Sequence, residues 1–452
     1  MLKPCPYSSL RRRPPEGHGF SAVRPLNPLG CPCPIAPAWH SLQMPRPQRA
    51  KYPFCARCSF PFMVIVRRAS SFPFFATGSF RFAAVILLSP IVSSRAATGI
   101  GFLDQNPDLT ISADARVRYE SDWDSHTSAG VLRTDRERGR LRARLGAAYK
   151  FSPEWSVGGR FRTGSHQSQQ SPHLTFTAND GPSDDLEGSF DKYFIQYKAG
   201  AVTAWAGRNS PLFWQQNEFT LDEDITPTGV NLAFDSKPGT GTITTSLGAF
   251  ALPDGATRLS GELVAGQVKY VLPLKPSQFT LAVSLYDFEG ERGARFLRNR
   301  NGERDYLVGV LSAQWSTPIQ GRPLALGVDL IENFQDYSAA DAAPLTPRNA
   351  GETSGYVFSA QFGQLKQAKD WTVGYYYAHI ETFAVNAAYS EDDWARFGSS
   401  TQSDLTDIKG HEFRAAYAIS KNINVMARLF LVEAITTVQD GKRFRLDLNW
   451  KL

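Results

Sequence analysis

The stretch RGRLRARLGAAYK, residues 138–150, alternates arginine with apolar residues. Successive side chains of a β-strand point to opposite faces of a sheet, so this alternation predicts a strand with one cationic and one apolar face. A helix, with its period of about 3.6 residues, would mix the two kinds around its circumference. The cationic face holds Arg140, Arg142 and Arg144, and the apolar face holds Leu141, Ala143, Leu145, Ala147 and Tyr149.

The same period of two continues through residues 107–452 and predicts an all-β fold. Most runs have roughly 8–13 residues, longer than the mode of about 5–6 for soluble strands and near the about 9–11 that cross a membrane at a tilt. We predict 16 strands, with 18 as the alternative count. The runs are 109–119, 139–151, 154–163, 189–198, 201–208, 228–235, 241–252, 261–272, 277–287, 304–316, 322–335, 354–364, 369–382, 410–419, 422–433 and 442–452.

The connections between these runs alternate between short and long. Turns such as FSPE and KAG alternate with segments such as 209–227 and 383–409. This asymmetry is typical of an outer-membrane barrel with short periplasmic turns and long external loops. Because the bilayer core offers no water to backbone amides, the sheet must close on itself. The sequence therefore predicts a transmembrane antiparallel β-barrel over residues 107–452, with both of its ends on the periplasmic side.

Charge divides the chain into two parts. Residues 1–97 hold 13 of the 49 lysines and arginines and only one of the 43 acidic residues, so residues 98–452 are net acidic. The basic character therefore belongs to the first part, and we do not interpret it as nucleic-acid binding. All five cysteines also lie before residue 97, in a proline-rich context that offers no scaffold for zinc. We expect no metal and no cofactor.

The first part resembles an export signal. In residues 63–96, arginines precede the apolar run FAAVILLSPIV, and SRA follows as a small-x-small cleavage site, so we predict a signal peptide there. Residues 1–62 are then an extension that is non-native or disordered, and Met63 is an alternative start to Met1. Residues 97–106 form a short lead-in to the barrel.

Aromatic residues stand at strand ends next to short turns. Tryptophan is enriched where a membrane protein crosses the lipid headgroups, so we predict a membrane-interface position for four of them. A barrel of 16 strands is wide enough to hold water, so its inner face should be polar. The four predicted interface residues are Trp155, Trp315, Trp371 and Trp450.

Three stretches resemble the putative porin family of Gram-negative bacteria. They are the opening DRERGRLRARLG (135–146) with GGRFRTG (158–164), then AWAGRNSPLFW (204–214), and the closing third with YSEDDWARFG (389–398) and FRLDLNWKL (444–452). The resemblance implies an outer-membrane barrel that passes small solutes. The chain departs from such barrels in its last residue, since Leu452 stands where an aromatic residue is usual.

Arginines recur at inward positions of the first three and the last predicted strands. Barrel closure brings these strands together, so we predict a pore-lining basic wall that draws anions. Arginine stays charged and presents a planar fork that suits carboxylates and phosphates. The alternative is that the arginines pair with loop acids and hold a loop in place. The predicted wall comprises Arg116, Arg118, Arg140, Arg142, Arg144, Arg160, Arg162, Arg443 and Arg445.

The third external loop, 209–229, carries a cluster of acids after an aromatic stretch. The resemblance to porins implies that this loop folds into the lumen and sets a constriction, with its acids facing the basic wall. A solvated external loop and a calcium site at Asp222–Asp224 are the alternatives. We interpret a second acidic loop, 389–407, as solvated, with shared divalent cations at lipopolysaccharide as its alternative. The predicted constriction-loop acids are Glu218, Asp222, Glu223 and Asp224.

These patterns favour an outer-membrane porin for passive diffusion of small hydrophilic solutes, biased toward anions. The alternatives are a specific channel or exporter for an acidic sugar or polysaccharide, and a non-conducting structural or adhesin barrel. We expect no enzyme activity, because no catalytic grouping occurs at constrained spacing. The expected partners are outer-membrane lipid and lipopolysaccharide, the barrel-assembly machinery, and small hydrophilic or anionic solutes, with a homotrimer as a possible assembly and no nucleic acid.

Overall fold

The computed structural model describes residues 106–166, 171–254, 259–294, 303–338, 349–394 and 406–452. Every described residue belongs to one compact unit, Ile91–Leu452. The predicted extension (1–62), the predicted signal peptide (63–96) and the predicted lead-in up to residue 105 lie outside the described residues.

The described residues form β-strands and no α-helix. No helix in these ranges is long and apolar enough to cross a membrane. The strands are β1 (Leu109–His126), β2 (Arg136–Lys150), β3 (Trp155–Thr163), β4 (Leu174–Ala178), β5 (Gly188–Ala199), β6 (Val202–Arg208), β7 (Thr228–Ser236), β8 (Thr242–Pro253), β9 (Leu259–Leu274), β10 (Ser277–Glu289), β11 (Tyr306–Ile319), β12 (Arg322–Asn333), β13 (Ser354–Gly363), β14 (Trp371–Ile380), β15 (Ile408–Ala418), β16 (Ile423–Ala434) and β17 (Asp440–Lys451).

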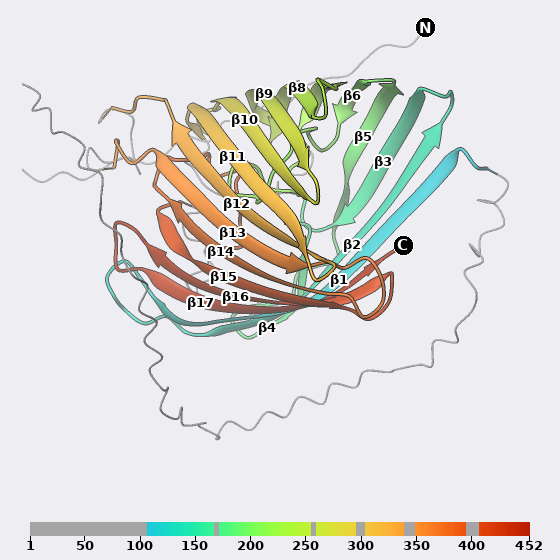
Figure 1. The fold of residues 1–452 in the computed structure, drawn as a ribbon. Coiled ribbons are helices and arrows are strands. Elements are labelled where there is room, and N and C mark those ends of the chain that lie inside the picture. The colour runs from blue at the N-terminus through green and yellow to red at the C-terminus, as the bar shows by residue number, and fades with distance from the viewer. Residues whose placement is uncertain (1–105, 167–170, 255–258, 295–302, 339–348, 395–405) are drawn as a thin grey trace, which may run out of the picture. The chain divides into compact units, whose positions relative to one another are not determined.

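Sixteen of these strands close into an antiparallel ring (Figure 1). Each ring strand pairs with its neighbours along the chain, and β1 pairs with both β2 and β17. The closure brings Asp114 opposite Lys451, and the backbone amide of Leu452 continues the ladder by donating to the carbonyl of Ala113 at 2.9 Å. The predicted 16-stranded barrel is therefore confirmed, and so is the alternation of short turns with long loops.

The short strand β4 lies outside the ring and was not predicted. It interrupts the long connection between β3 and β5 and pairs with residues 138–141 of β2. The physical reason is an overhang: β2 has 15 residues but β3 has only 9, so the outer part of β2 would expose an unpaired edge. Strand β4 covers that edge.

The two faces of the strands are sorted as the sequence predicts. On β2, Leu145 is 58% exposed and points outward, whereas Arg142 is 5% exposed and points inward. The same sorting recurs across the ring, for example at Val283 of β10, which is 57% exposed and faces outward. The apolar outer face suits contact with lipid, since lipid-facing and lumen-facing residues alternate in membrane barrels.

One half of the inner face departs from the expected polar lining. Inward side chains of β6 and of β8 to β16, such as Phe250, Tyr286 and Val308, form one apolar cluster with residues of two loops. These are the β6–β7 loop (residues 209–227) and the β14–β15 loop (residues 381–407), represented by Phe219 and Phe383. Burial of this apolar surface stabilises both loops inside the barrel. The arginines lie on the other side of the lumen, away from most of this apolar cluster.

Candidate functional site

The nine arginines of the predicted wall lie on the inner face of four adjacent strands, β17, β1, β2 and β3. Cross-strand pairing places Arg116 opposite Arg142 and Arg118 opposite Arg140. Arg136 and Arg138 of β2 also point inward, and they extend the same surface toward the external end. The basic wall, as we use the term below, comprises Arg116, Arg118, Arg136, Arg138, Arg140, Arg142, Arg144, Arg160, Arg162, Arg443 and Arg445.

Carboxylates at neighbouring inward positions pair with much of this wall, and they are not among the predicted site residues. Asp447 accepts from Arg118 Nε at 2.7 Å, and Asp191 lies 2.5 Å from Arg160. The stretch DARVRYESD (114–122) could have predicted such carboxylates, because its acids occupy the same alternating, inward-facing positions as its arginines. Five carboxylates therefore offset part of the charge of the 11 arginines, which leaves the wall net positive. The five are Asp114, Glu120, Asp122, Asp191 and Asp447.

Arg140 differs from its neighbours because it makes no ion pair within the described residues. Its side chain is only 8% exposed, and Nη2 donates to the hydroxyl of Ser171 at 3.1 Å. The hydroxyl also lies 3.4 Å from Nδ1 of His173, whose buried Nε2 has no hydrogen-bond partner in the described residues. Burial and the charges of Arg118 and Arg140 hold the pKa of His173 well below its usual range, so the imidazole is neutral.

The β6–β7 loop lies inside the barrel. Trp214 donates its backbone amide to Gln267 of β9 at 2.8 Å, and Gln216 donates to Asp329 of β12 at 2.8 Å. At its far end the loop reaches the basic wall, where Asp224 lies 2.9 Å from Arg144. Hydrogen bonds to inward side chains of separate strands hold the loop across the lumen.

The four predicted acids of this loop divide into two pairs. Asp224 pairs with Arg144, and the exposed Glu223 lies 3.9 Å from Arg142. Glu218 and Asp222 instead turn toward the β14–β15 loop and make no ion pair within the described residues. The first pair thus contacts the wall, whereas the second pair has no cationic partner within the described residues.

The interpretation of residues 389–407 as a solvated loop is wrong for the part that is described. Tyr389 and Trp394 are 1% and 2% exposed, and the carbonyl of Tyr389 accepts from the amide of Asp222 at 2.9 Å. The rings of Phe219 and Trp394 meet edge to face with centroids 5.1 Å apart. Aromatic residues interspersed among the acids give this segment an apolar side, and that side packs inward. Residues 395–405 lie outside the described residues.

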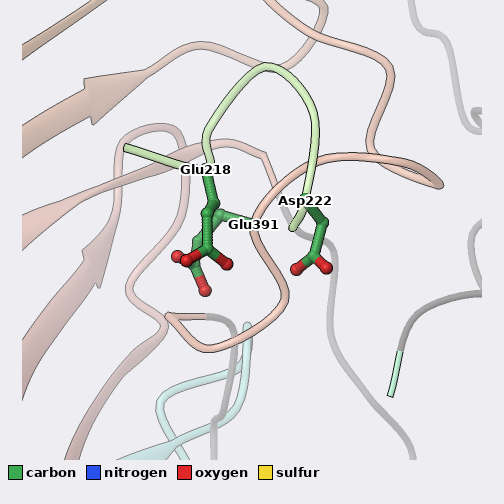
Figure 2. Close-up of side chains that lie close together, drawn as sticks. All are labelled: Glu218, Asp222 and Glu391. Atoms are coloured by element: carbon green, nitrogen blue, oxygen red, sulfur yellow. The ribbon is translucent and has the colours of Figure 1, made fainter. Parts of the chain in front are cut away.

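The two loops bring three carboxyl groups together. Oxygens of Glu218, Asp222 and Glu391 all lie within 4.8 Å of one another (Figure 2). Glu218 and Asp222 come from the β6–β7 loop, and Glu391 comes from the β14–β15 loop. We call these three residues the loop carboxyl cluster. Oxygen donors at such spacing suit a hard divalent cation, but clustering alone identifies no ion.

Burial and mutual repulsion shift the titration of this cluster. Burial and the neighbouring Asp393 raise the pKa of Glu391 to about 8. Burial and nearby carboxylates also raise the pKa values of Glu218 and Asp222 well above their usual range. Asp393, by contrast, has a pKa well below its usual range because the charges of Arg445 and Arg428 outweigh its burial. Glu391 is therefore largely protonated at neutral pH, and mutual repulsion opposes full ionisation of the cluster, whereas Asp393 is ionised.

A cavity of about 180 Å³ separates the basic wall from the two loops. Arg116 and Arg118 line one side, and Glu218 and Asp222 line the other. Opposite charges on two sides of a cavity set a transverse field across it, which would orient a charged or dipolar molecule bound there. The remaining lining residues are Ser171, His173, Glu223, Asp224, Asp392, Asp393, Arg414, Met426 and Arg428.

Comparison with known protein families decides the identity. A family model described as "Putative porin" matches residues 109–302 and 305–452, which is most of the chain. The chain belongs to the putative porin family. It is an outer-membrane protein with the fold of a channel.

Solved porins are similar to this chain at low sequence identity. OprB of Pseudomonas putida is 12% identical, with a TM-score of 0.50 over 79% of this chain and 96% of that chain. A BenF-like porin of Pseudomonas fluorescens Pf-5 is 11% identical, with a TM-score of 0.45 over 77% of this chain and 99% of that chain. A search of curated proteins found no match. The likeness to OprB supports the barrel fold of this porin and extends no further.

The four predicted interface tryptophans of this porin lie at strand ends beside short turns. Trp155, Trp315 and Trp450 are each 40% exposed. Trp371 is less exposed, and the guanidinium of Arg322 lies 4.8 Å from its ring centroid. All four thus occupy the short-turn end of the ring, where a headgroup position remains our proposal.

The raised pKa values of the loop carboxyl cluster lead to a first prediction. As pH rises from about 6 to 9, Glu391 ionises through its pKa of about 8, and negative charge is added to the constriction. We expect cation permeability to rise over this window, as measured by the reversal potential in a salt gradient. Glu391→Gln should flatten this change, and Glu381→Gln, outside the cluster, should not. The facing charged groups are Glu218, Asp222, Asp392, Asp393, Glu412 and Arg428.

A flat reversal potential from pH 6 to 9 in the unmodified porin would contradict this assignment. An equal response in Glu391→Gln and the unmodified porin would show that other groups titrate instead.

Proposed function

We propose that this porin is a channel for passive diffusion of small hydrophilic solutes, with a preference for anions. The observation that carries the proposal is the cavity between the basic wall and the two inward loops. Diffusion needs only a continuous water path, and selectivity follows from its width and the charge of its lining. The proposal includes no catalysed reaction.

The anion preference is supported by the charge of the wall. Eleven inward arginines face five inward carboxylates of the same sheet region, and Arg140 has no carboxylate partner within the described residues. The loop acids Glu223, Asp224 and Asp393 also lie beside arginines of the wall, and the arginines still outnumber these carboxylates. A positive potential raises the local concentration of anions and their rate of entry.

Reconstitution of the full chain tests the proposal. In liposome swelling, small neutral sugars should enter through the porin and large oligosaccharides should not. In a planar bilayer at neutral pH, the reversal potential under a potassium chloride gradient should report chloride as the more permeant ion. A correctly folded barrel that admits no sugar and carries no current would contradict the channel function. A potassium preference would contradict only the anion bias.

An exporter of an acidic polysaccharide is the second candidate, favoured by the arginine content alone. Such a chain would need a continuous basic path, whereas carboxylates such as Asp447 interrupt the wall, and two loops cross the lumen. A non-conducting barrel is the third candidate, favoured by the apolar packing of these loops. Tight block of the current by uronate oligomers would support the exporter, and absence of any current would support the non-conducting barrel.

We also propose that this porin assembles with copies of itself, and a trimer is the expectation by analogy with other porins. Strand β6 has 7 residues. A tilted strand of that length spans about 18 Å, less than the apolar band of about 25 Å. An outward groove of about 650 Å³ lies over this short part of the wall, lined by Ala204, Ala206 and Val230 among others. Light scattering in detergent should report three chains, and a single chain would contradict the assembly.

A further inference from the structure

The cavity beside the basic wall is small and has two opposite ends. Its volume is about 180 Å³. The cationic end is lined by Arg116, Arg118 and His173, and the anionic end by Glu218 and Asp222. Each end also carries polar atoms that could form hydrogen bonds with a ligand.

At the cationic end, Arg116 is the available donor. Its Nε donates to Asn449 at 2.7 Å, and its closest carboxylate, Asp447, is 3.7 Å away and already bound by Arg118. The planar fork of Arg116 can thus bind a carboxylate with two parallel hydrogen bonds. The buried Nε2 of His173 lines the same cavity without a partner in the described residues, and a buried polar atom without a partner is costly.

At the anionic end, the loop carboxyl cluster is the available acceptor. Asp222 is 6% exposed, and neither it nor Glu218 forms an ion pair within the described residues. An ammonium group donates three hydrogen bonds and would relieve the repulsion among clustered carboxylates. The amide of Asp224 donates to Asp222 at 2.7 Å and fixes the direction of that carboxyl group.

The two ends together discriminate among ligand classes. A simple anion at the arginine end would meet the carboxyl cluster across the cavity. A simple cation at the cluster would likewise meet Arg116 and Arg118. A small molecule with a carboxylate at one end and an ammonium at the other satisfies both ends at once, and specificity of this kind includes repulsion of the wrong partners.

We propose that this cavity is a binding site for small zwitterions of the amino-acid class, with the carboxylate on Arg116 and the ammonium on Glu218 and Asp222. The proposal rests on the channel function proposed above and assigns that channel a substrate class. It makes the porin selective at one site rather than a uniform sieve.

Three probes of equal chain length test the site in the full-length porin. They are 5-aminovalerate, which is a zwitterion, valerate, which carries only the carboxylate, and pentylamine, which carries only the ammonium. Each is titrated against the potassium chloride current in a planar bilayer. We expect 5-aminovalerate to interrupt the current at a concentration at least about tenfold lower than either single-charge probe, a ratio equivalent to about 1.4 kcal/mol.

Substitutions at each end provide the second part of the test. Arg116→Gln and Asp222→Asn should each reduce the advantage of the zwitterion to about threefold or less, and Arg116→Lys should restore part of it. Asp235→Asn, at an exposed position of β7, is the matched control and should keep the full advantage. The heat-dependent mobility of the folded barrel in gels shows that each variant is assembled.

The outcomes separate this proposal from the channel function. An assembled porin that carries no current would overturn the channel function itself. A conducting porin that responds equally to all three probes would overturn the zwitterion site alone. Block by valerate as strong as block by 5-aminovalerate would also overturn it, because the cavity would then be a simple anion site.

Discussion

Replacing Arg140, Arg142 and Arg144 together by glutamine is expected to lower the anion-to-cation permeability ratio about tenfold. The change removes three positive charges from one strand of the basic wall and leaves Asp114 and Asp224 without their partners. Two charges about 4 Å apart interact by about 1 kcal/mol in bulk water and more beside protein, and about 1.4 kcal/mol corresponds to a factor of ten. The measurement is the reversal potential of the reconstituted porin under a potassium chloride gradient.

The triple change to lysine is the matched control, because it keeps the charge and loses only the guanidinium fork. It should retain most of the anion preference. Unchanged selectivity in the glutamine variant would refute the role of the wall in permeation and leave these arginines with the task of holding the β6–β7 loop.

The second large effect is expected on the outer face of the barrel. Val283 lies near the middle of β10 and is 57% exposed toward lipid. An arginine at the bilayer midplane costs about 2–4 kcal/mol, so Val283→Arg should lower the free energy of unfolding by that amount. The measurement is urea unfolding of the barrel in lipid vesicles, followed by tryptophan fluorescence.

Val283→Ala is the matched control, since it removes apolar surface without adding charge, and it should cost about 1 kcal/mol or less. An equally small loss for arginine would place Val283 away from the hydrocarbon and would contradict the orientation of β10.

The strands of this porin could be predicted because each carries a two-residue period in which apolar residues face lipid. The register in which the strands pair is also well determined, because a slip by one residue would turn Leu145 inward and Arg144 into the bilayer. Strand ends were less predictable: β1 continues to His126 beyond its predicted end at residue 119. The acids at its outer end resemble a loop in sequence, but they face inward and pair with arginines.

The candidate site was only partly predictable. The two-residue alternation along each strand was sufficient to assign the arginines to the inner face. The partners of Arg118 and Arg160, in contrast, depend on pairing between segments far apart in the chain. The loop carboxyl cluster depends on two loops that meet inside the barrel, and no local pattern predicts such a meeting. A signal for it did exist in the β14–β15 loop, where Tyr389 and Trp394 flank the acids.

These features combine into one account of the porin. Two loops pack against the apolar part of the inner face, and the basic wall lines a cavity on the other side of these loops. Glu218 and Asp222 of the loop carboxyl cluster line the same cavity. We propose that selectivity is set by this short constriction between two charged surfaces and not by the whole length of the barrel.

Thiol modification of a single introduced cysteine tests the water-filled passage most directly. Met426→Cys places a thiol in the lining of the cavity, and Leu446→Cys places one on the outer face, where Leu446 is 42% exposed. The native cysteines all precede residue 97, so the unmodified porin serves as the blank. A charged, membrane-impermeant methanethiosulfonate reagent should lastingly change the single-channel current of Met426→Cys and leave Leu446→Cys and the blank unchanged. Modification of Leu446→Cys but not of Met426→Cys would contradict the account.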